Sequence, residues 1–457
     1  MAELLAEVGR LRSSVDDLRT ALADRNARVG ELEKLLEQSR RSAKRQAAPF
    51  SKGEPSDEPA RAGRKKGKAH GRHGHRAAPV SPDRVLDAPL PTCCPGCGGE
   101  VDFERWAEQF QTELPTLQPT VTKFRIGVGR CRGCRRRVQG RHPEQTSDAL
   151  GAASSQVGPR ALAWGSWLHY GLGLSFGKTS ALLGRLGINV TAGAIASSSA
   201  STSTDLVPTH NAIKAHVAAS PAVTMDETGW RIGGEGVWLW VAATDDATIY
   251  DVARGRGFDQ AVNLVPADYA GTIVRDGWVV YNSYEKATHQ TCIAHLVRRC
   301  HEMIEDQPAW TRSTPRRIKN LLLEALDARD LDVKGRAAAV IDIGERLDLL
   351  FEEAHPHDAN RRLVKHLRHE RGALFSFLSI DGVDATNWRG EQGVRPAVVN
   401  RKVWGGNRTD RGAETQGRLM TFLRTAHQQG ADAIDLLVDL ARAPNPGVVA
   451  GLILHSS

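Results

Sequence analysis

Two aspartates, Asp226 and Asp276, have the residue type and setting for metal-assisted chemistry. Each follows a short apolar run typical of a β-strand, residues 222–225 and 272–275. Two carboxylates that are brought together repel each other unless a cation lies between them. With a third acid they could hold two divalent ions, which generate a nucleophile and neutralise the leaving oxygen of a phosphodiester. Mg²⁺, or Mn²⁺ in its place, suits such hard oxygen ligands.

The third acid should come from a helix later in the chain. Glu391, in the segment 386–396, and Glu414, in the segment 411–414, would serve the chemistry equally well. The residues alone leave both open.

Two C-x-x-C pairs form a second chemical pattern. Cys94 and Cys97 are answered by Cys131 and Cys134, and four thiolates can close a tetrahedral, structural zinc site. Cys93 could substitute for Cys94. We expect a zinc ribbon over residues 89–145, in which residues 101–103 and 121–128 pair as strands. The second pair continues into three arginines that predict a basic surface for DNA, with a protein contact as the alternative: Arg135, Arg136 and Arg137.

The order of elements around the aspartates predicts a ribonuclease-H-like core. Strands are expected at 222–225, 237–243, 248–252, 272–275 and 289–293, with a turn at Asp245 and Asp246 and short helices at 258–264 and 281–286. In that architecture the first strand lies beside the fourth, so Asp226 and Asp276 would meet. We expect this core to span residues 216–300 and 381–430.

Helical patterns surround the core. An all-helical insertion is expected at 301–380, with helices at 318–326, 340–351 and 361–377, and a helical tail at 431–457 is broken by Pro444 and Pro446. Before the core, residues 150–215 read as three helices at 159–170, 176–186 and from 192 onward, the last capped by Thr191. This region could be a DNA-binding helix-turn-helix or a plain three-helix unit.

The N-terminal 40 residues carry a heptad repeat that predicts a parallel two-stranded coiled coil, and hence a homodimer. Val8, Val15, Leu22, Val29 and Leu36 occupy the a positions, Leu4, Leu11, Leu18 and Leu32 occupy the d positions, and Arg25 interrupts the d row. Residues 41–88 lack periodicity and form a basic linker, either a plain tether or one that adds affinity for phosphates. Its histidines, His70, His73 and His75, could also bind metal.

Bulk composition agrees with a multidomain α+β protein that binds nucleic acid. The chain has 457 residues, with 61 Lys and Arg against 53 Asp and Glu and a formal charge of +8. No apolar run reaches the roughly 18 residues that a membrane span needs, and no signal peptide is evident. We therefore expect a soluble, cytoplasmic protein with no membrane partner.

Several motifs, in order, resemble the insertion-sequence 66 family of bacterial transposases. They are Asp226-Glu227-Thr228-Gly229-Trp230, the following Val237-Trp238-Leu239-Trp240-Val241, Asp276-Gly277, the run from Cys292 to Arg299, and Thr386-Asn387 with Glu391, Arg395-Pro396, Arg401-Lys402, Trp404 and Gly412. The likeness covers nearly the whole chain, because that family also has a coil, a linker, a zinc-binding domain and a helical region before its catalytic core.

The resemblance implies that Asp226, Asp276 and Glu391 are the metal-binding DDE residues, and it decides between the two rivals for the third acid. It also places Cys292 and His295 near the active site, as helpers in DNA positioning or as core residues. Phosphate contacts are expected from Arg298, Arg299, Arg401 and Lys402. Other acids of the region are expected to be surface carboxylates: Glu227, Asp245, Asp246 and Glu414.

The implied function is DNA transposition, with cleavage of the element's ends and strand transfer into target DNA by the freed 3′-hydroxyls. The double-stranded partners would be terminal inverted repeats and target DNA, and the setting implied by the resemblance is the bacterial cytoplasm, near the nucleoid. Two alternatives remain: a catalytically inactive, zinc-containing DNA-binding protein, such as a repressor or domesticated remnant, and a nuclease that cuts branched DNA without needing terminal repeats.

Overall fold

The computed structural model describes residues 77–454, and the chain forms two units, residues 1–113 and 114–457. The predicted coiled coil and most of the linker, with its three histidines, lie outside the described residues. In the first unit the described segment bends back at Cys93 and Glu100, which form an antiparallel bridge. The strand expected at residues 101–103 is not formed, because these exposed residues have no strand partner within the described part of that unit.

Four helices precede the sheet in the second unit: α2 (Pro159–Ser166), α3 (Phe176–Arg185), α4 (Ala192–Asp205) and α5 (Val207–Ala219). A π-helical turn, η2 (Trp167–Gly171), follows α2. The three expected helices are confirmed, as is the Thr191 cap, whose hydroxyl accepts the Ala194 N–H at 3.1 Å. Leu168, Leu183 and Ile195 form a small core among them.

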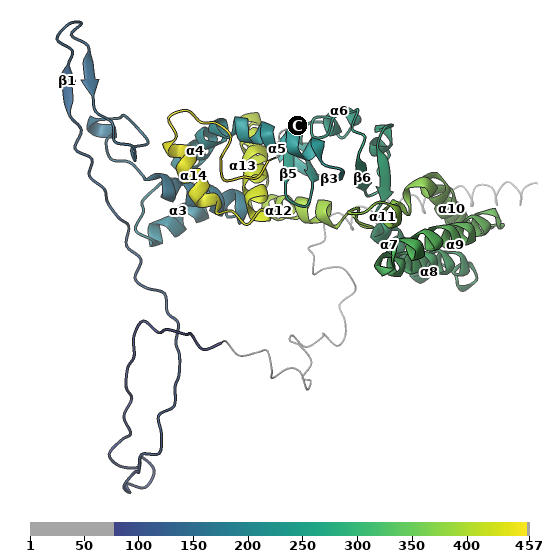
Figure 1. Ribbon diagram of the computed structural model, residues 1–457, viewed down its shortest axis with the longest axis horizontal. Coiled ribbons are helices and arrows are strands. Elements are labelled where there is room, and N and C mark those ends of the chain that lie inside the picture. Colours follow the sequence, from purple (N-terminus) through teal and green to yellow (C-terminus); the bar gives the residue numbers. More distant parts are fainter. Residues whose placement is uncertain (1–76, 455–457) are drawn as a thin grey trace, which may run out of the picture. The chain divides into compact units, whose positions relative to one another are not determined.

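A five-stranded mixed sheet forms the centre of the second unit (Figure 1). Its strands are β3 (Ala222–Ile232), β4 (Glu235–Ala243), β5 (Thr248–Ala253), β6 (Thr272–Arg275) and β7 (Thr288–Thr291). The spatial order is β5-β4-β3-β6-β7, antiparallel across β5, β4 and β3 and parallel across β3, β6 and β7. The expected neighbourhood of first and fourth strands is therefore confirmed.

The first strand is longer than the sequence suggested. It turns into β4 through Gly233 and Gly234, whose φ angles of 59° and 93° suit a tight hairpin that other residues adopt with difficulty. Its outer half is stabilised by burial, since Trp230 and Ile232 pack in one core with residues of two later helices. The short helix expected at 258–264 is α6 (Phe258–Ala261), and that expected at 281–286 is a 3₁₀ turn, η3 (Val279–Ser283).

Two long helices from late in the chain cover the sheet. One, α12 (Trp388–Trp404), lies over β3 and β4, and the other, α13 (Asp410–Gln428), runs along the edge strand β5. Thr421 and Thr425 of α13 accept the N–H groups of Tyr250 and Thr248 at 2.9 and 3.1 Å. At the opposite edge, Ser376 donates to the His289 carbonyl of β7 at 2.7 Å. Both edges of the sheet are thus occupied by side chains of other elements.

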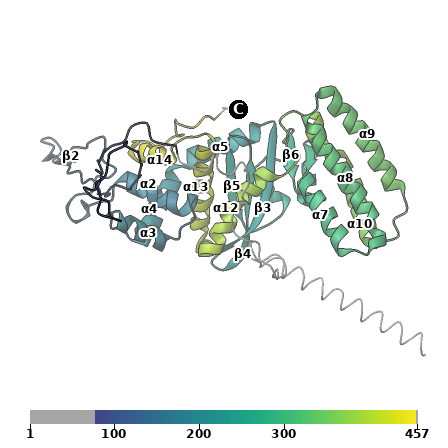
Figure 2. The same ribbon diagram turned by 90° about the horizontal axis from the view of Figure 1, so that it is seen from below.

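Five helices occupy the stretch between β7 and α12: α7 (Ile293–Asp306), α8 (Ser313–Asp327), α9 (Val333–Glu352), α10 (Asp358–Glu370) and α11 (Ser376–Ser379). Figure 2 shows α7 to α10 side by side beyond β6. Leu322, Leu347 and Leu363 are fully buried in a core of their own. The predicted helical character is confirmed, and no strand interrupts residues 293–379. The last helix, α14 (Ala433–Arg442), ends before Pro444 as expected.

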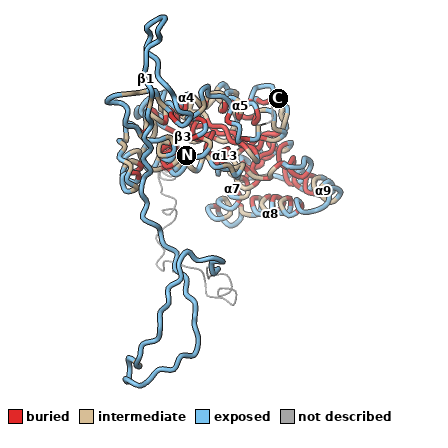
Figure 3. The backbone as a smooth tube through the Cα atoms, turned by 60° about the vertical axis from the view of Figure 1, so that its left-hand side comes forward, coloured by how far each residue is buried: buried red, intermediate tan, exposed pale blue. Residues whose placement is uncertain are grey.

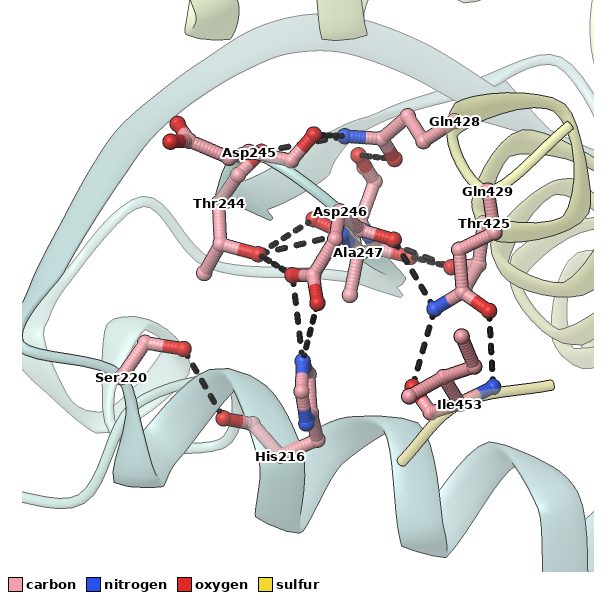
Figure 4. Close-up of polar contacts among 11 residues, drawn as sticks. His216, Ser220, Thr244, Asp245, Asp246, Ala247, Thr425, Gln428, Gln429 and Ile453 are labelled. Atoms are coloured by element: carbon pink, nitrogen blue, oxygen red, sulfur yellow. Dashed lines mark hydrogen bonds and ion pairs between the residues drawn. The ribbon is translucent and has the colours of Figure 1, made fainter. Parts of the chain in front are cut away.

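The β4–β5 turn is held from three sides (Figure 4). His216 of α5 lies 3.0 Å from the Asp246 carboxylate, Thr244 donates to Asp246 at 2.8 Å, and Gln429 bonds to the Asp246 carbonyl at 3.2 Å. Although partial burial opposes it, these bonds from His216 and Thr244 hold the pKa of Asp246 below its ordinary value.

Figure 3 shows buried residues gathered in the sheet and its covering helices. Among residues 77–454 no helix is both long and apolar enough to span a membrane.

Candidate active site

Asp226 and Asp276 lie at matching positions of two neighbouring parallel strands. The β3–β6 pairing ends with Thr224 opposite Val274, and each aspartate is two residues further along its own strand direction. Because side chains alternate along a strand, each aspartate continues the side of its strand that Thr224 or Val274 occupies. Asp276 directly follows β6 as predicted. Asp226 does not follow its strand but lies inside β3, because the glycine hairpin extends that strand by several residues.

The electrostatics of Asp226 reflect crowding of acids in a buried place. Burial, followed by the negative charges of Asp276 and Glu227, raises its pKa from 3.8 to about 7. Each aspartate also accepts one backbone N–H, Asp226 from Glu227 at 2.8 Å and Asp276 from Trp278 at 2.9 Å. These bonds fix one oxygen of each carboxylate. A divalent cation between the two groups would relieve their repulsion.

The helix that carries Glu391 packs closely against β3 and β4, because two of its residues that face these strands are glycines. Glu391 lies in the first turn of α12, next to Gly390, where an added Cβ would be 3.0 Å from the Cβ of Asp226 and 2.4 Å from Oδ1 of Asn387. One turn later, a Cβ on Gly393 would meet Cγ2 of Val241 at 2.9 Å. Neither position tolerates a larger residue without movement. The glycines that weaken the helix are therefore explained by packing.

The Glu391 carboxylate itself is directed toward a histidine. Its Oε1 lies 3.5 Å from Nε2 of His295, which is in the first turn of α7. The Cys292 side chain, and then the Glu391 charge, raise the pKa of His295 against the opposing effect of burial. His295 is also close enough to Asp226 to affect that pKa. The histidine therefore interacts electrostatically with both Glu391 and Asp226.

The donor chemistry of this site fits a divalent ion, whereas the positions of the donors do not yet form a ligand set. Asp226 and Asp276 supply hard oxygens under mutual repulsion. Within residues 77–454, however, no group of three or more His, Cys, Asp or Glu side chains is arranged to hold a metal ion.

A comparison with known families identifies the chain. A family model described as "Transposase IS66 family" matches residues 154–415, more than half of the sequence. The chain belongs to this family. It is also 23% identical over 472 residues to an uncharacterized protein, y4qI, of Sinorhizobium fredii strain NBRC 101917 / NGR234, an alignment that covers 94% of this chain and 81% of the relative.

The family match contains all three acids of this IS66-family chain and both residues of the Cys292–His295 pair. Cys292 is 1% exposed, and its Sγ accepts the Asn387 N–H at 3.2 Å, which ties the start of α7 to the residue before α12. His295 remains partly accessible, with its side chain 34% exposed. The two residues therefore differ in setting, one in the core and the other beside Glu391.

The expectation that Glu227 is a surface carboxylate is wrong. Its side chain is 1% exposed, and it forms an ion pair with Arg256 at 2.5 Å. Strand alternation carried the signal, because Glu227 lies on the same side of β3 as the buried Val223 and Met225. The other acids fit the expectation better. Asp245 and Glu414 are largely exposed, and Asp246 is partly buried by its contact with His216.

The arginines predicted to contact DNA fall into two groups. The exposed group consists of four arginines and one lysine: Arg135, Arg136, Arg137, Arg298 and Lys402. Arg299 and Arg401 are half-buried, and burial lowers the pKa of both. Arg401 also donates to the carbonyl of Gly229 in β3. Arg401 therefore has a structural contact in addition to any contact with DNA.

The two C-x-x-C segments have the same local geometry. Cys94 N–H donates to Gly99 O and Gly98 N–H to Cys94 O, both at 2.8 Å, while Cys131 and Arg135 repeat this pattern at 2.8 and 2.9 Å. Gly98 and Arg135 both have positive φ, 75° and 62°. Backbone N–H groups of Gly96 and Cys97, and of Cys134 and Gly133, lower the pKa of Cys94 and Cys131 respectively.

Each segment belongs to a different unit of the chain. The second is framed by β1 (Val128–Arg130) and β2 (Arg137–Gln139), an antiparallel pair. The strand expected at 121–128 is thus formed only at its last residue. Arg135 and Arg136 lie in the connection between these strands, directly after Cys134 in the sequence.

Proposed function

We propose that this IS66-family protein catalyses metal-dependent cleavage and strand transfer at the ends of a bacterial insertion sequence. The observation that supports it best is the placement of Asp226 and Asp276 at matching positions of adjacent parallel strands, with the helix of Glu391 against Asp226. The strand order β5-β4-β3-β6-β7 supports assigning a ribonuclease-H-like core. The family match extends from the helical region through this core.

The three acids would hold Mg²⁺ or Mn²⁺, which supplies an activated nucleophile and neutralises the leaving oxygen. Asp226 and Asp276 would bind first, since their mutual repulsion falls when a cation is shared. His295 would release the Glu391 carboxylate, 46% exposed and only 3.5 Å away, to complete the set. The exposed Arg298 would then contact a phosphate of the DNA strand that enters beside α7.

A structural zinc ion is proposed for the two C-x-x-C segments. Their identical backbone pattern orients N–H groups toward Cys94 and Cys131, which stabilises thiolates. Thiolates are ligands that zinc prefers, and Cys94, Cys97, Cys131 and Cys134 would supply four of them. The proposed role is to present Arg135, Arg136 and Arg137 to the terminal repeats, with the coiled coil of residues 1–40 joining two copies.

The test uses the full-length protein with Mg²⁺ or Mn²⁺ and a DNA duplex that carries the element's terminal inverted repeats. We expect nicks at the repeat ends and joining of the 3′ ends to target DNA. Asp276→Asn and Glu391→Gln should each abolish both products. Glu414→Gln is the matched control, because Glu414 is 59% exposed and its ion pair with Arg418, at 3.2 Å, lies within its own helix.

A second candidate function, a catalytically inactive DNA-binding protein, is favoured by one observation: Glu391 is paired with His295 and not with the aspartates. Binding of the terminal repeats with no cutting in any divalent metal would support it. Cutting of branched DNA without terminal repeats would instead indicate a nuclease on the same core.

A further inference from the structure

A buried charged group connects the segments that carry the two aspartates, on the side of β3 opposite Asp226. Glu227 is next to Asp226 in the chain, and its carboxylate accepts Nε and Nη2 of Arg256 on Oε1 at 2.8 and 2.5 Å. Its other oxygen, Oε2, accepts the hydroxyl of Tyr281 at 2.5 Å. Both carboxylate oxygens are therefore occupied, within a side chain that is almost inaccessible to solvent.

Arg256 is itself fixed by two aromatic rings. Its guanidinium carbon lies 4.4 Å from the ring centroid of Trp238 in β4 and 4.0 Å from that of Trp278. Arginine in such a position gains from stacking and cation–π attraction as well as from its ion pair. Its side chain is 32% exposed, so the ion pair is formed mostly away from water.

Trp278 and Tyr281 both belong to the segment that follows Asp276. Trp278 is two residues beyond that aspartate and donates its backbone N–H to Oδ1 of Asp276 at 2.9 Å. Tyr281 is fully buried in η3. Burial, and then the Glu227 charge, raise the pKa of Tyr281, so its hydroxyl stays protonated as a donor. The segment is thus attached to Glu227 directly through Tyr281 and indirectly through Arg256.

These attachments matter because the backbone pairing between β3 and β6 does not reach the aspartates, although Asp226 is paired with Val241 of β4. The β3–β6 ladder ends at Thr224 and Val274, two residues before Asp226 and Asp276. Beyond that point no backbone pairing joins β3 to the segment of Asp276, so side-chain contacts between them can set the separation of the two carboxylates. The contacts of Glu227 are suited to this, since they join the residue after Asp226 to residues shortly after Asp276.

We propose that Glu227, Arg256 and Tyr281 are positioning residues that hold the segment 276–283 against β3 and thereby set the affinity of the aspartate pair for a divalent ion. We refer to these three residues as the latch. The inference rests on the proposed function only for its consequence in metal binding, because the mechanical role concerns the ion-free chain as well.

The latch is tested with the full-length protein and three conservative variants. Arg256→Lys keeps the charge but loses the planar stacking and the two-nitrogen contact, Glu227→Gln keeps the shape, and Tyr281→Phe removes one hydroxyl. The matched control is Arg254→Lys. Arg254 is two residues from Arg256 and also forms ion pairs, with Glu235 at 2.6 Å and Asp410 at 3.0 Å. It is 59% exposed, and these partners lie in β4 and α13.

The first measurement is amide hydrogen exchange of peptides covering residues 276–284 in metal-free buffer. Loss of a charged, buried contact should raise their exchange about tenfold in the latch variants, with Arg254→Lys unchanged. The second measurement is binding of Mn²⁺ alone by calorimetry, where a latch variant should weaken affinity by about tenfold to a hundredfold. In the cleavage assay the Mn²⁺ concentration for half-maximal rate should rise while the rate at saturating Mn²⁺ is nearly retained.

Unchanged exchange at 276–284 in folded latch variants would overturn the proposal. So would faster exchange throughout the sheet, since that would mean general destabilisation. Should the wild-type chain neither bind Mn²⁺ nor cut DNA, the proposed function fails, and the exchange result still decides the mechanical role. Faster exchange with unaltered Mn²⁺ affinity would refute the link between the latch and the metal.

Discussion

Asp226 should lower the stability of the folded protein when no cation is present. Its pKa is raised from 3.8 to about 7 by burial and by Asp276 and Glu227. At about 1.36 kcal/mol per pKa unit, keeping this carboxylate ionised at pH 8 costs the folded chain about 4 kcal/mol. Asp226→Asn removes that cost. It also replaces the charged acceptor of the Glu227 N–H, which subtracts about 1 kcal/mol.

We therefore expect Asp226→Asn to raise the free energy of unfolding by about 2 to 3 kcal/mol at pH 8 in a chelator. The pH dependence of stability follows from proton binding. An acid whose pKa is raised in the folded state favours the folded state below about pH 4, and this contribution is lost as pH rises through about 7. The increase in unfolding free energy caused by Asp226→Asn should therefore be less than half as large at pH 5 as at pH 8.

The assay is urea unfolding followed by the fluorescence of Trp230 and Trp240, which are buried in the same sheet. Asp268→Asn, at an exposed position, is the control and should change little. Added Mg²⁺ should stabilise the wild-type chain but not Asp226→Asn, which should also fail to cut DNA. A variant that is less stable than the wild type at pH 8 without metal would refute the electrostatic reasoning.

Three further predictions concern packing and the thiols. Gly390→Ala places a Cβ 2.4 Å from Asn387 Oδ1, so we expect a loss of about 1 to 3 kcal/mol in urea unfolding and impaired DNA cutting, whereas Gly184→Ala, with no atom within 4 Å, should do neither. Thr421→Val leaves the buried Tyr250 N–H without its acceptor and should lower the unfolding free energy by about 1 to 3 kcal/mol, compared with little change for Thr204→Val on an exposed helix face. Cys131→Ser should remove the bound zinc, measured by atomic emission, and expose residues 89–145 to proteolysis without shifting the unfolding of the core. Cys93→Ser is the control and should keep the metal. Retention of zinc by Cys131→Ser would exclude Cys131 as a ligand.

The positions of the strands could be predicted because short apolar runs between glycine and aspartate turns are typical of β-strands. The length of β3 could not be predicted, since residues 226–229 look like the polar segment that follows a strand. They continue it because Trp230 and Ile232 find partners on α12 and α13, and those contacts are invisible in a local window. The burial of Glu227 was also not predicted from the sequence. Strand alternation places its side chain on the buried side of β3, but its partner Arg256 lies in a loop without any periodic pattern.

Spacing alone did not select Glu391 over Glu414, and only the family resemblance did. The structure supplies a physical difference between them. The helix of Glu391 approaches Asp226 through Gly390 and Gly393, whereas Glu414 points outward from α13. From the sequence, a glycine within a helix is expected to lower the stability of that helix. Here the two glycines allow close contact with strands more than 140 residues earlier in the chain, which a local sequence pattern does not reveal.

The occupied edges of the sheet restrict how copies of this protein can associate. Strand-to-strand addition, a common route to both dimers and fibrils, needs unpaired backbone groups at an edge. Here threonine hydroxyls satisfy β5, and a serine hydroxyl bonds to β7. Edge-to-edge pairing of this five-stranded sheet between two copies is therefore disfavoured, and the proposed assembly on two DNA ends would use other surfaces of the protein.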